Sequence, residues 1–202
     1  MTVLDAIINV NRFDLLVLLF AFGMFVLGFV QGTIRRVLGL ASMLFSFLFA
    51  ANLRDPLGNY LAANWNQYPD EYAVMLGFLI VFVAANIAFS LIIQGFYHRT
   101  PLFQKYQFVD EAIGGILGVI QGAFFLGCIF VILDSYFLIP GAPQTSGELP
   151  ILRSFFDFYN DSGTAYLYRS QLIPGFYTIF GLFIPEDLKK FYVSGSAPTP
   201  AS

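Results

Sequence analysis

Long apolar runs separated by short polar connections dominate the hydrophobic pattern of this chain. Residues 15–34 contain no charged side chain, and further apolar runs cover residues 37–53, 73–97 and 113–133. A helix rises about 1.5 Å per residue, so runs of roughly 17 to 25 residues cross the ~30 Å hydrocarbon core of a bilayer. The pattern therefore predicts an all-α fold, an integral membrane bundle of four transmembrane helices.

The connections between these runs have the composition of turns and loops. Arg35 and Arg36 interrupt the first two runs, which predicts a tight helical hairpin. Residues 54–72 hold two prolines, a glycine and several charged side chains, which predicts a loop outside the hydrocarbon. A signal peptide is the alternative for the first run, but charged residues precede it and no small-residue cleavage site closes it.

The chain changes character after the fourth run. We expect a four-helix transmembrane domain over residues 13–136, a non-cytoplasmic tail with short interfacial helices over 137–185, and a flexible C-terminus over 186–202. Residues 172–184 are apolar but only 13 long, and they contain Pro174. An interfacial or re-entrant segment is therefore favoured over a fifth span.

Composition and charge narrow the class of protein. The chain is 57% hydrophobic and 11% charged, about half the charge of a soluble globular domain. The formal net charge of -3 and the lack of a basic stripe exclude a nucleic-acid partner. Cys128 is the single cysteine, which excludes an intramolecular disulfide and a cysteine-rich metal site.

Small residues recur at a spacing of four on each apolar run. Helices in a bilayer gain little by hiding apolar surface from lipid, so they associate where small residues let their backbones approach. We therefore predict close helix packing, within the bundle or in a homo-oligomer. The packing residues are Gly28, Gly32, Ser42, Ser46, Ala84, Ala88, Gly114, Gly118 and Gly122, with Ala73 and Gly77 repeating the spacing at the start of the third run.

Basic residues predict the orientation, because Lys and Arg near the spans favour the cytoplasmic side. The first and third connections carry Arg35, Arg36, Arg99 and Lys105, whereas Arg12 and Arg54 are the cations before the first run and in the second connection. We therefore expect both termini to lie outside the cytoplasm.

Residues that would support catalysis or metal binding are scarce. His98 is the single histidine and lies beside Arg99, which argues against a catalytic triad or a multi-histidine metal site. We expect no cofactor, no metal and no catalytic residue. The ionisable groups fall at the ends of the runs, which disfavours a proton relay, but Asn86, Gln94 and Gln121 leave an oligomeric pore open.

Two glycine-rich segments and part of the tail form a pattern that a known family shares. Its residues are Asp14, the segment from Gly28 to Gly32, Arg35, Arg36, Gly39, Ala50, Val109, Asp110, Gly114, Gly118, Gln121, Gly122, and a tail segment from Arg169 and Ser170 to Pro185. This pattern resembles the colicin V production protein family of small bacterial inner-membrane proteins. The resemblance implies four spans and a role in toxin production or export, without a catalytic residue. Some relatives add an outer protease domain, which this tail is too short to hold.

Two functions follow as hypotheses. In the first, a non-enzymatic membrane scaffold or accessory factor supports an envelope process in the bacterial inner membrane, with envelope proteins as partners besides the lipid bilayer. In the second, the chain forms a small oligomeric channel or transporter.

Overall fold

The computed structural model describes residues 11–65, 69–96, 107–139 and 148–186, together with Leu188 and Tyr192. Within these ranges the regular structure is helical and contains no strand. Four of the helices are long and apolar enough to cross a membrane, which confirms the predicted all-α bundle.

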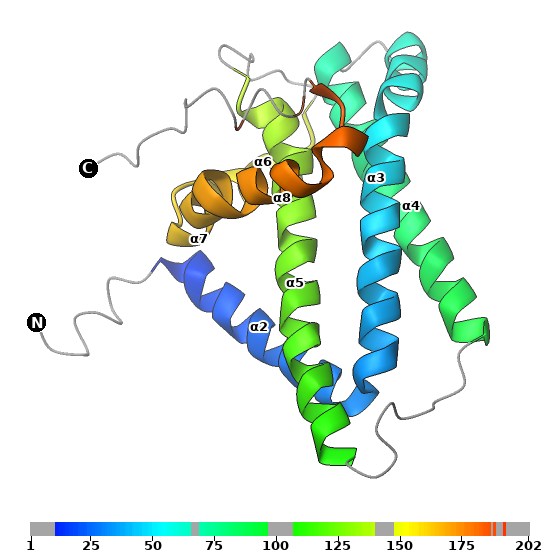
Figure 1. The fold of residues 1–202 in the computed structure, drawn as a ribbon. Helices are drawn as coiled ribbons and strands as arrows, with labels where there is room; N and C mark the ends of the chain where they lie inside the picture. The colour runs from blue at the N-terminus through cyan, green and yellow to red at the C-terminus, as the bar shows by residue number, and fades with distance from the viewer. Residues whose placement is uncertain are drawn as a thin grey trace, which may run out of the picture.

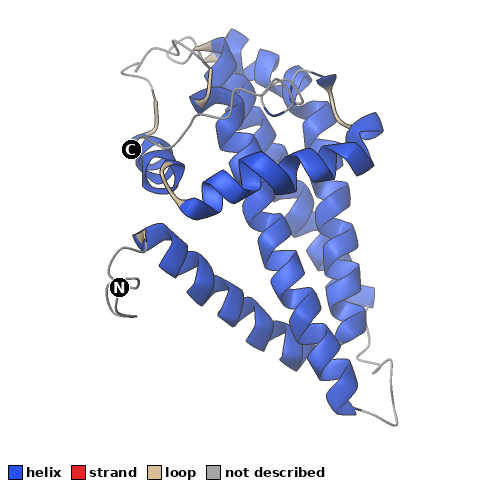
Figure 2. Cartoon of the chain, turned by 60° about the vertical axis from the view of Figure 1, so that its left-hand side comes forward, coloured by secondary structure: helices blue, strands red, loops and turns tan. Residues whose placement is uncertain are grey.

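The long helices precede a group of short ones (Figure 1). The long helices are α2 (Arg12–Gln31), α3 (Thr33–Asn64), α4 (Asp70–Phe96) and α5 (Gln107–Phe137). The tail contains α6 (Pro150–Asn160), α7 (Gly163–Leu167), a π-helical turn η1 (Tyr168–Leu172), α8 (Ile173–Phe180) and a 3-10 turn η2 (Gly181–Phe183). Figures 1 and 2 show that the tail helices lie across the bundle, near the end of α2 where that helix begins.

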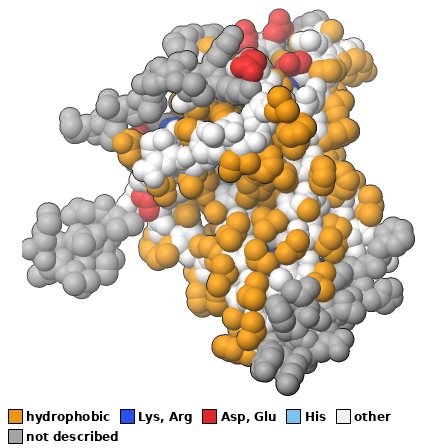
Figure 3. Space-filling view, in the orientation of Figure 1, with side chains coloured by type: hydrophobic (Ala, Val, Ile, Leu, Met, Phe, Trp, Pro, Cys, Tyr) orange, Lys and Arg blue, Asp and Glu red, His pale blue; other side chains and the backbone are white. Residues whose placement is uncertain are grey.

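The outer surface of the long helices is apolar. Leu18, Leu19 and Phe22 on α2 are 69%, 65% and 65% exposed, and hydrophobic side chains cover most of the face below the crosswise helices (Figure 3). Such a surface would drive aggregation in water, whereas in a bilayer it contacts lipid tails.

The turn between α2 and α3 is made by Gly32 rather than by Arg35 and Arg36. Gly32 has φ 75°, a left-handed conformation that glycine adopts without strain, and the arginines lie in the first turns of α3. The expected tight hairpin is wrong, because α2 diverges from α3 and packs against α5 (Figure 1).

Glycines explain why α2 prefers α5. A Cβ added to Gly118 would overlap the carbonyl oxygen of Met24, and one added to Gly114 would lie 2.6 Å from the carbonyl oxygen of Gly28. Gly122 faces Met24 in the same way, with an added Cβ 2.8 Å from its Cγ. The glycine stripe therefore packs within the chain. A homo-oligomer stays a prediction, and because α2 covers this stripe, its interface would lie on another face.

Helix α3 continues through the region predicted to be a loop. It runs to Asn64 with Pro56 inside it, so a loop over residues 54–72 is wrong for residues 54–64. The reason is tertiary contact with α4, where an added Cβ on Gly77 would lie 3.0 Å from the backbone nitrogen of Gly58. Close packing of two backbones outweighs the local preference of proline and glycine for turns.

The small residues of α3 and α4 divide into two groups. Ser42 and Ser46 are buried, and the Ser46 hydroxyl donates a 2.8 Å hydrogen bond to the Ser42 carbonyl oxygen. Ala84 and Ala88 are exposed, so they do not pack within this chain, and their packing in a homo-oligomer stays a prediction. The α3 and α4 pair is instead joined by Gly58 and Gly77, at the other end of α4.

The tail extends its contacts beyond the predicted boundary at residue 185. Leu188 is fully buried, and the Tyr192 hydroxyl donates a hydrogen bond to Asp134. Both side chains pack with the core, while the expected flexibility of residues 186–202 stays a prediction. Residues 172–184 fold mainly into α8, whose eight residues are too few to cross a bilayer; their interfacial placement stays a prediction.

The glycine contact between α2 and α5 predicts a position-specific effect of one methyl group. We expect Gly118→Ala to lower the free energy of unfolding by about 1 to 3 kcal/mol, because the methyl overlaps the α2 backbone. Gly23→Ala is the matched control, since no atom lies within 4 Å of its added Cβ, and it should be neutral or slightly stabilising. Thermal unfolding in detergent measures both, and equal melting temperatures would contradict the packing.

Candidate functional site

A buried carboxylate on α5 anchors the tail to the bundle. Asp134 lies one turn before the end of α5 and is fully buried. Its partner is Arg169, which lies in the π-helical turn of the tail and is 7% exposed. The sequence placed Asp134 at the end of a span, and the structure shows that this end is covered by the tail.

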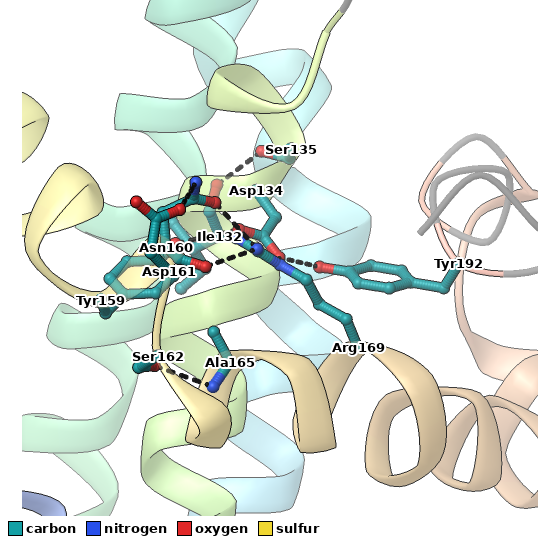
Figure 4. Close-up of polar contacts among 10 residues, drawn as sticks. All are labelled: Ile132, Asp134, Ser135, Tyr159, Asn160, Asp161, Ser162, Ala165, Arg169 and Tyr192. Carbon is teal, nitrogen blue, oxygen red and sulfur yellow. Dashed lines mark hydrogen bonds and ion pairs between the residues drawn. The ribbon is translucent and has the colours of Figure 1, made fainter. Parts of the chain in front are cut away.

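The two side chains form a bidentate ion pair (Figure 4). Arg169 Nε donates to Asp134 Oδ2 at 2.8 Å, and Arg169 Nη2 donates to Asp134 Oδ1 at 2.7 Å. The planar guanidinium matches the two carboxylate oxygens, which makes this the strong form of an ion pair. The geometry holds the π-helical turn at a defined position on α5.

Three further polar groups complete the network. The Tyr159 hydroxyl donates to Asp134 Oδ1 and the Tyr192 hydroxyl to Asp134 Oδ2, both at 2.9 Å. Arg169 Nη1 donates to the Asn160 side-chain oxygen at 2.9 Å. Each oxygen of Asp134 thus accepts two hydrogen bonds, which offsets the cost of burying its charge.

The local sequence places these groups through caps and aromatic packing. Ser162 accepts a hydrogen bond from the backbone nitrogen of Ala165 at 3.0 Å and begins α7 (Figure 4). From α2, Asp14 accepts bonds from the backbone nitrogens of Gly163 and Thr164, where the positive end of a helix favours a carboxylate. The start of the tail helix is therefore tied to the start of α2.

Aromatic rings fill the space between the tail and the bundle. The Phe130 ring on α5 stacks on the Tyr159 ring of α6 with 4.4 Å between centroids, and it meets Tyr168 edge to face. Phe13 from α2 contacts Phe130 and Tyr159. Helices α2 and α5 and two elements of the tail therefore converge around the ion pair.

Burial changes the acid–base properties of the tail groups. Burial and the charge of Asp134 raise the pKa of Tyr159 and of Tyr192 well above the ordinary value of 10.0. Burial lowers the pKa of Arg169, but its hydrogen bonds to Asp134 and the charge of that carboxylate outweigh this effect and raise it. Arg169 stays charged and the tyrosines stay neutral at physiological pH.

A second polar group lies at the other end of the bundle. Arg36 on α3 is 5% exposed, and its Nη1 donates a 2.8 Å hydrogen bond to Gln121 Oε1 on α5. Asn86 on α4 lines the same cavity, so two of the three predicted intramembrane amides come together. The third amide, Gln94, lies on α4, but its side chain is not described, and the topology residues Arg99 and Lys105 lie outside the described residues.

The arrangement at Asp134 is suited to holding two segments together. Its carboxylate oxygens, the guanidinium and the tyrosine hydroxyls are committed to one another, so the carboxylate has no free position for a reacting group. Among the residues that the structure describes, no group of three or more His, Cys, Asp or Glu could hold a metal ion. The network is therefore suited to holding the tail against α5.

Most of the chain matches one known protein family. The model of the colicin V production protein family matches residues 13–176, from the start of α2 to α8. The chain belongs to this family. It is thus a membrane protein of the colicin V production family, as the resemblance predicted. No curated protein and no solved structure matches the chain.

Sequence reasoning found some of these functional positions and missed their pairing. Asp14, Gly114, Gly118, Gln121 and Arg169 all belonged to the resemblance, and all make contacts between elements in this family member. The partner of Arg169 was missed. Two signals were available: Arg169 is the single charged residue between Asp161 and Glu186, and Asp134 closes an apolar run.

The ion pair predicts a non-additive loss of stability. Asp134→Ala or Arg169→Ala should each lower the free energy of unfolding by about 3 to 5 kcal/mol, because each leaves a buried charge unpaired. The double variant should lose less than the sum of the two. The control is Arg12→Ala, whose side chain is exposed and whose loss should cost about 0.5 kcal/mol or less. Thermal unfolding and proteolysis of the tail measure the cycle; additive losses would refute the coupling.

The tyrosines predict alkaline sensitivity of the docked tail. Because folding raises their pKa values, the stability that they contribute is complete below the unfolded pKa of about 10 and is lost as pH rises through the folded value. We expect Tyr192→Phe to cost about 1 kcal/mol near neutral pH and to reduce the fall in melting temperature above about pH 10. The exposed Tyr166→Phe is the control, and an identical alkaline fall in both variants would contradict this assignment.

Proposed function

We propose that this protein is a non-enzymatic scaffold for an envelope process, in which the bundle holds a platform at the membrane surface. The platform is the segment of residues 148–186. The observation that carries the proposal is the Asp134–Arg169 ion pair, because a fully buried bidentate pair fixes the platform rigidly to a spanning helix. The family supports a role in colicin V production.

Further contacts fix both ends of the platform. Near its start, Arg153 and Tyr136 both hold Glu148, with the Tyr136 hydroxyl 2.8 Å from the carboxylate. Near its end, Asn52 on α3 donates a 3.1 Å hydrogen bond to the Phe183 carbonyl oxygen. A platform held at several points presents a constant surface, which reduces the entropy that a partner must overcome on binding.

We further propose the bacterial inner membrane as the location, with both termini outside the cytoplasm. Arg35 and Arg36 support this orientation, since they lie at the end of the bundle away from the platform. The platform then lies on the periplasmic side, where a toxin passes during export. A reporter fused after Ser202 that is active only in the cytoplasm would overturn the orientation.

A channel or transporter is the second candidate, because Arg36, Asn86 and Gln121 line a polar cavity among the four long helices. Further along α3 the path meets packed aromatic rings, with Phe47 in contact with Phe82 and Phe124. The cavity of one chain is thus closed toward the platform. A channel or transporter must carry an ion or solute across the membrane of reconstituted vesicles, whereas a scaffold need not.

The scaffold predicts a protein contact that depends on the docked platform. We expect a photo-crosslinker at the exposed Asp157 position on α6 to capture a defined envelope protein in a toxin-producing strain. The same crosslinker at Leu18, on the lipid-facing side of α2, should capture none. Adding Asp134→Ala and Arg169→Ala should abolish the crosslink and lower toxin secretion several-fold, while the chain still inserts. Wild-type secretion with an undocked platform would refute the proposal.

A further inference from the structure

A polar cavity forms where the four long helices meet, at the end of the bundle that holds the α2–α3 turn. Its volume is about 140 Å³, roughly ten times the ~10–15 Å³ that one water needs. It is lined by Gln31, Arg35, Arg36, Gly39, Ser42, Asn86, Ser90, Ile93 and Gln121. All but Gly39 and Ile93 carry hydrogen-bonding side chains, which are costly to bury in an apolar bundle unless their donors and acceptors are paired.

The cavity contains donors that the described part of the chain does not satisfy. Arg36 is 95% buried, and its Nη1 bonds to Gln121, but its Nε has no described partner. The Nδ2 of Asn86 likewise has none. Because Gln121 uses its carbonyl oxygen to accept from Arg36, its own amide nitrogen also remains a donor into the cavity.

The charge in the cavity is positive. Arg35 and Arg36 both line it, and no acidic side chain is among the described lining residues. Asp110, the nearby acid on α5, lies beside Gly32, where an added Cβ would be 2.6 Å from its carboxylate oxygen. A buried guanidinium without a counter-charge among the described residues is strongly unfavourable, so an anion in the cavity would be stabilised.

We propose that this cavity binds the phosphate group of an anion, supplied by a phospholipid headgroup or by soluble phosphate. A guanidinium presents paired N–H groups that match phosphate oxygens. Asn86, Gln121 and the two serine hydroxyls supply neutral donors around it. Gln31, Arg35 and Arg36 of the lining lie beside the α2–α3 turn, and at the end of a span both lipid headgroups and soluble anions are present.

Gly39 supports the assignment, because it makes room for the ligand-facing amide. An added Cβ there would lie 2.8 Å from the Gln121 amide nitrogen and 3.2 Å from its carbonyl oxygen. Alanine at this position would push the flexible Gln121 side chain aside while keeping the charges of both arginines. This substitution therefore tests the cavity without removing its charge.

The experiment uses the full chain, purified in neutral detergent and washed free of lipid. One arm titrates inorganic phosphate at constant ionic strength and follows the melting temperature. The other arm adds phosphatidylglycerol and counts bound lipids by native mass spectrometry. We expect Arg36→Gln to weaken binding about tenfold or more in whichever arm the wild-type chain binds its ligand, because charged hydrogen bonds to the ligand are lost.

Arg12→Gln is the matched control, since Arg12 is exposed at the opposite end of α2, and its binding should stay within about twofold of the wild type. Binding in the phosphate arm alone assigns a soluble ligand, and binding in the lipid arm alone assigns a headgroup. Gly39→Ala should also weaken binding, and it decides the matter if Arg36→Gln is not recovered folded. Binding in neither arm, or equal loss in Arg36→Gln and Arg12→Gln, would overturn the proposal.

Discussion

The ion pair between Asp134 and Arg169 is the interaction on which the platform depends. A carboxylate that is fully buried must be neutralised, and the tail supplies the cation 35 residues later in the chain. Once the pair forms, Tyr159 and Tyr192 complete the coordination of the carboxylate, and Phe130 stacks on Tyr159. The tail therefore becomes a fixed part of the bundle.

The bundle itself depends on a different force, because lipid offers apolar surface as favourable as any neighbouring helix. Close backbone approach at Gly28 and Gly118 gives α2 and α5 the van der Waals contact that hydrophobic burial cannot supply there. This contact draws α2 away from α3 and brings Asp14 to the start of α7. The glycine contact thus positions α2 against the platform, and the ion pair holds the same platform to α5.

Sequence reasoning succeeded for features that depend on neighbouring residues in the chain. It failed where several faces of one helix could each have packed against another helix. The four apolar runs and the glycine stripe including Gly118 are visible in one dimension. The small faces of α4 were equivalent in sequence, yet Gly77 packs on α3 while Ala84 and Ala88 are exposed. Pro56 was predicted to lie in a loop, but contact with α4 holds α3 together beyond it.

By itself the sequence determined that this is a membrane protein, how many long helices it has and to which family it belongs. These properties depend on composition and on the order of residues along the chain. Only the tertiary structure decided which groups meet: Arg169 with Asp134 in the platform, and Arg36 with Gln121 in the cavity. The physical reason is that the cost of a buried charge depends on its surroundings in space. The partners of each buried charge lie on different helices. Their spacing along the sequence does not show how close they are in the folded chain.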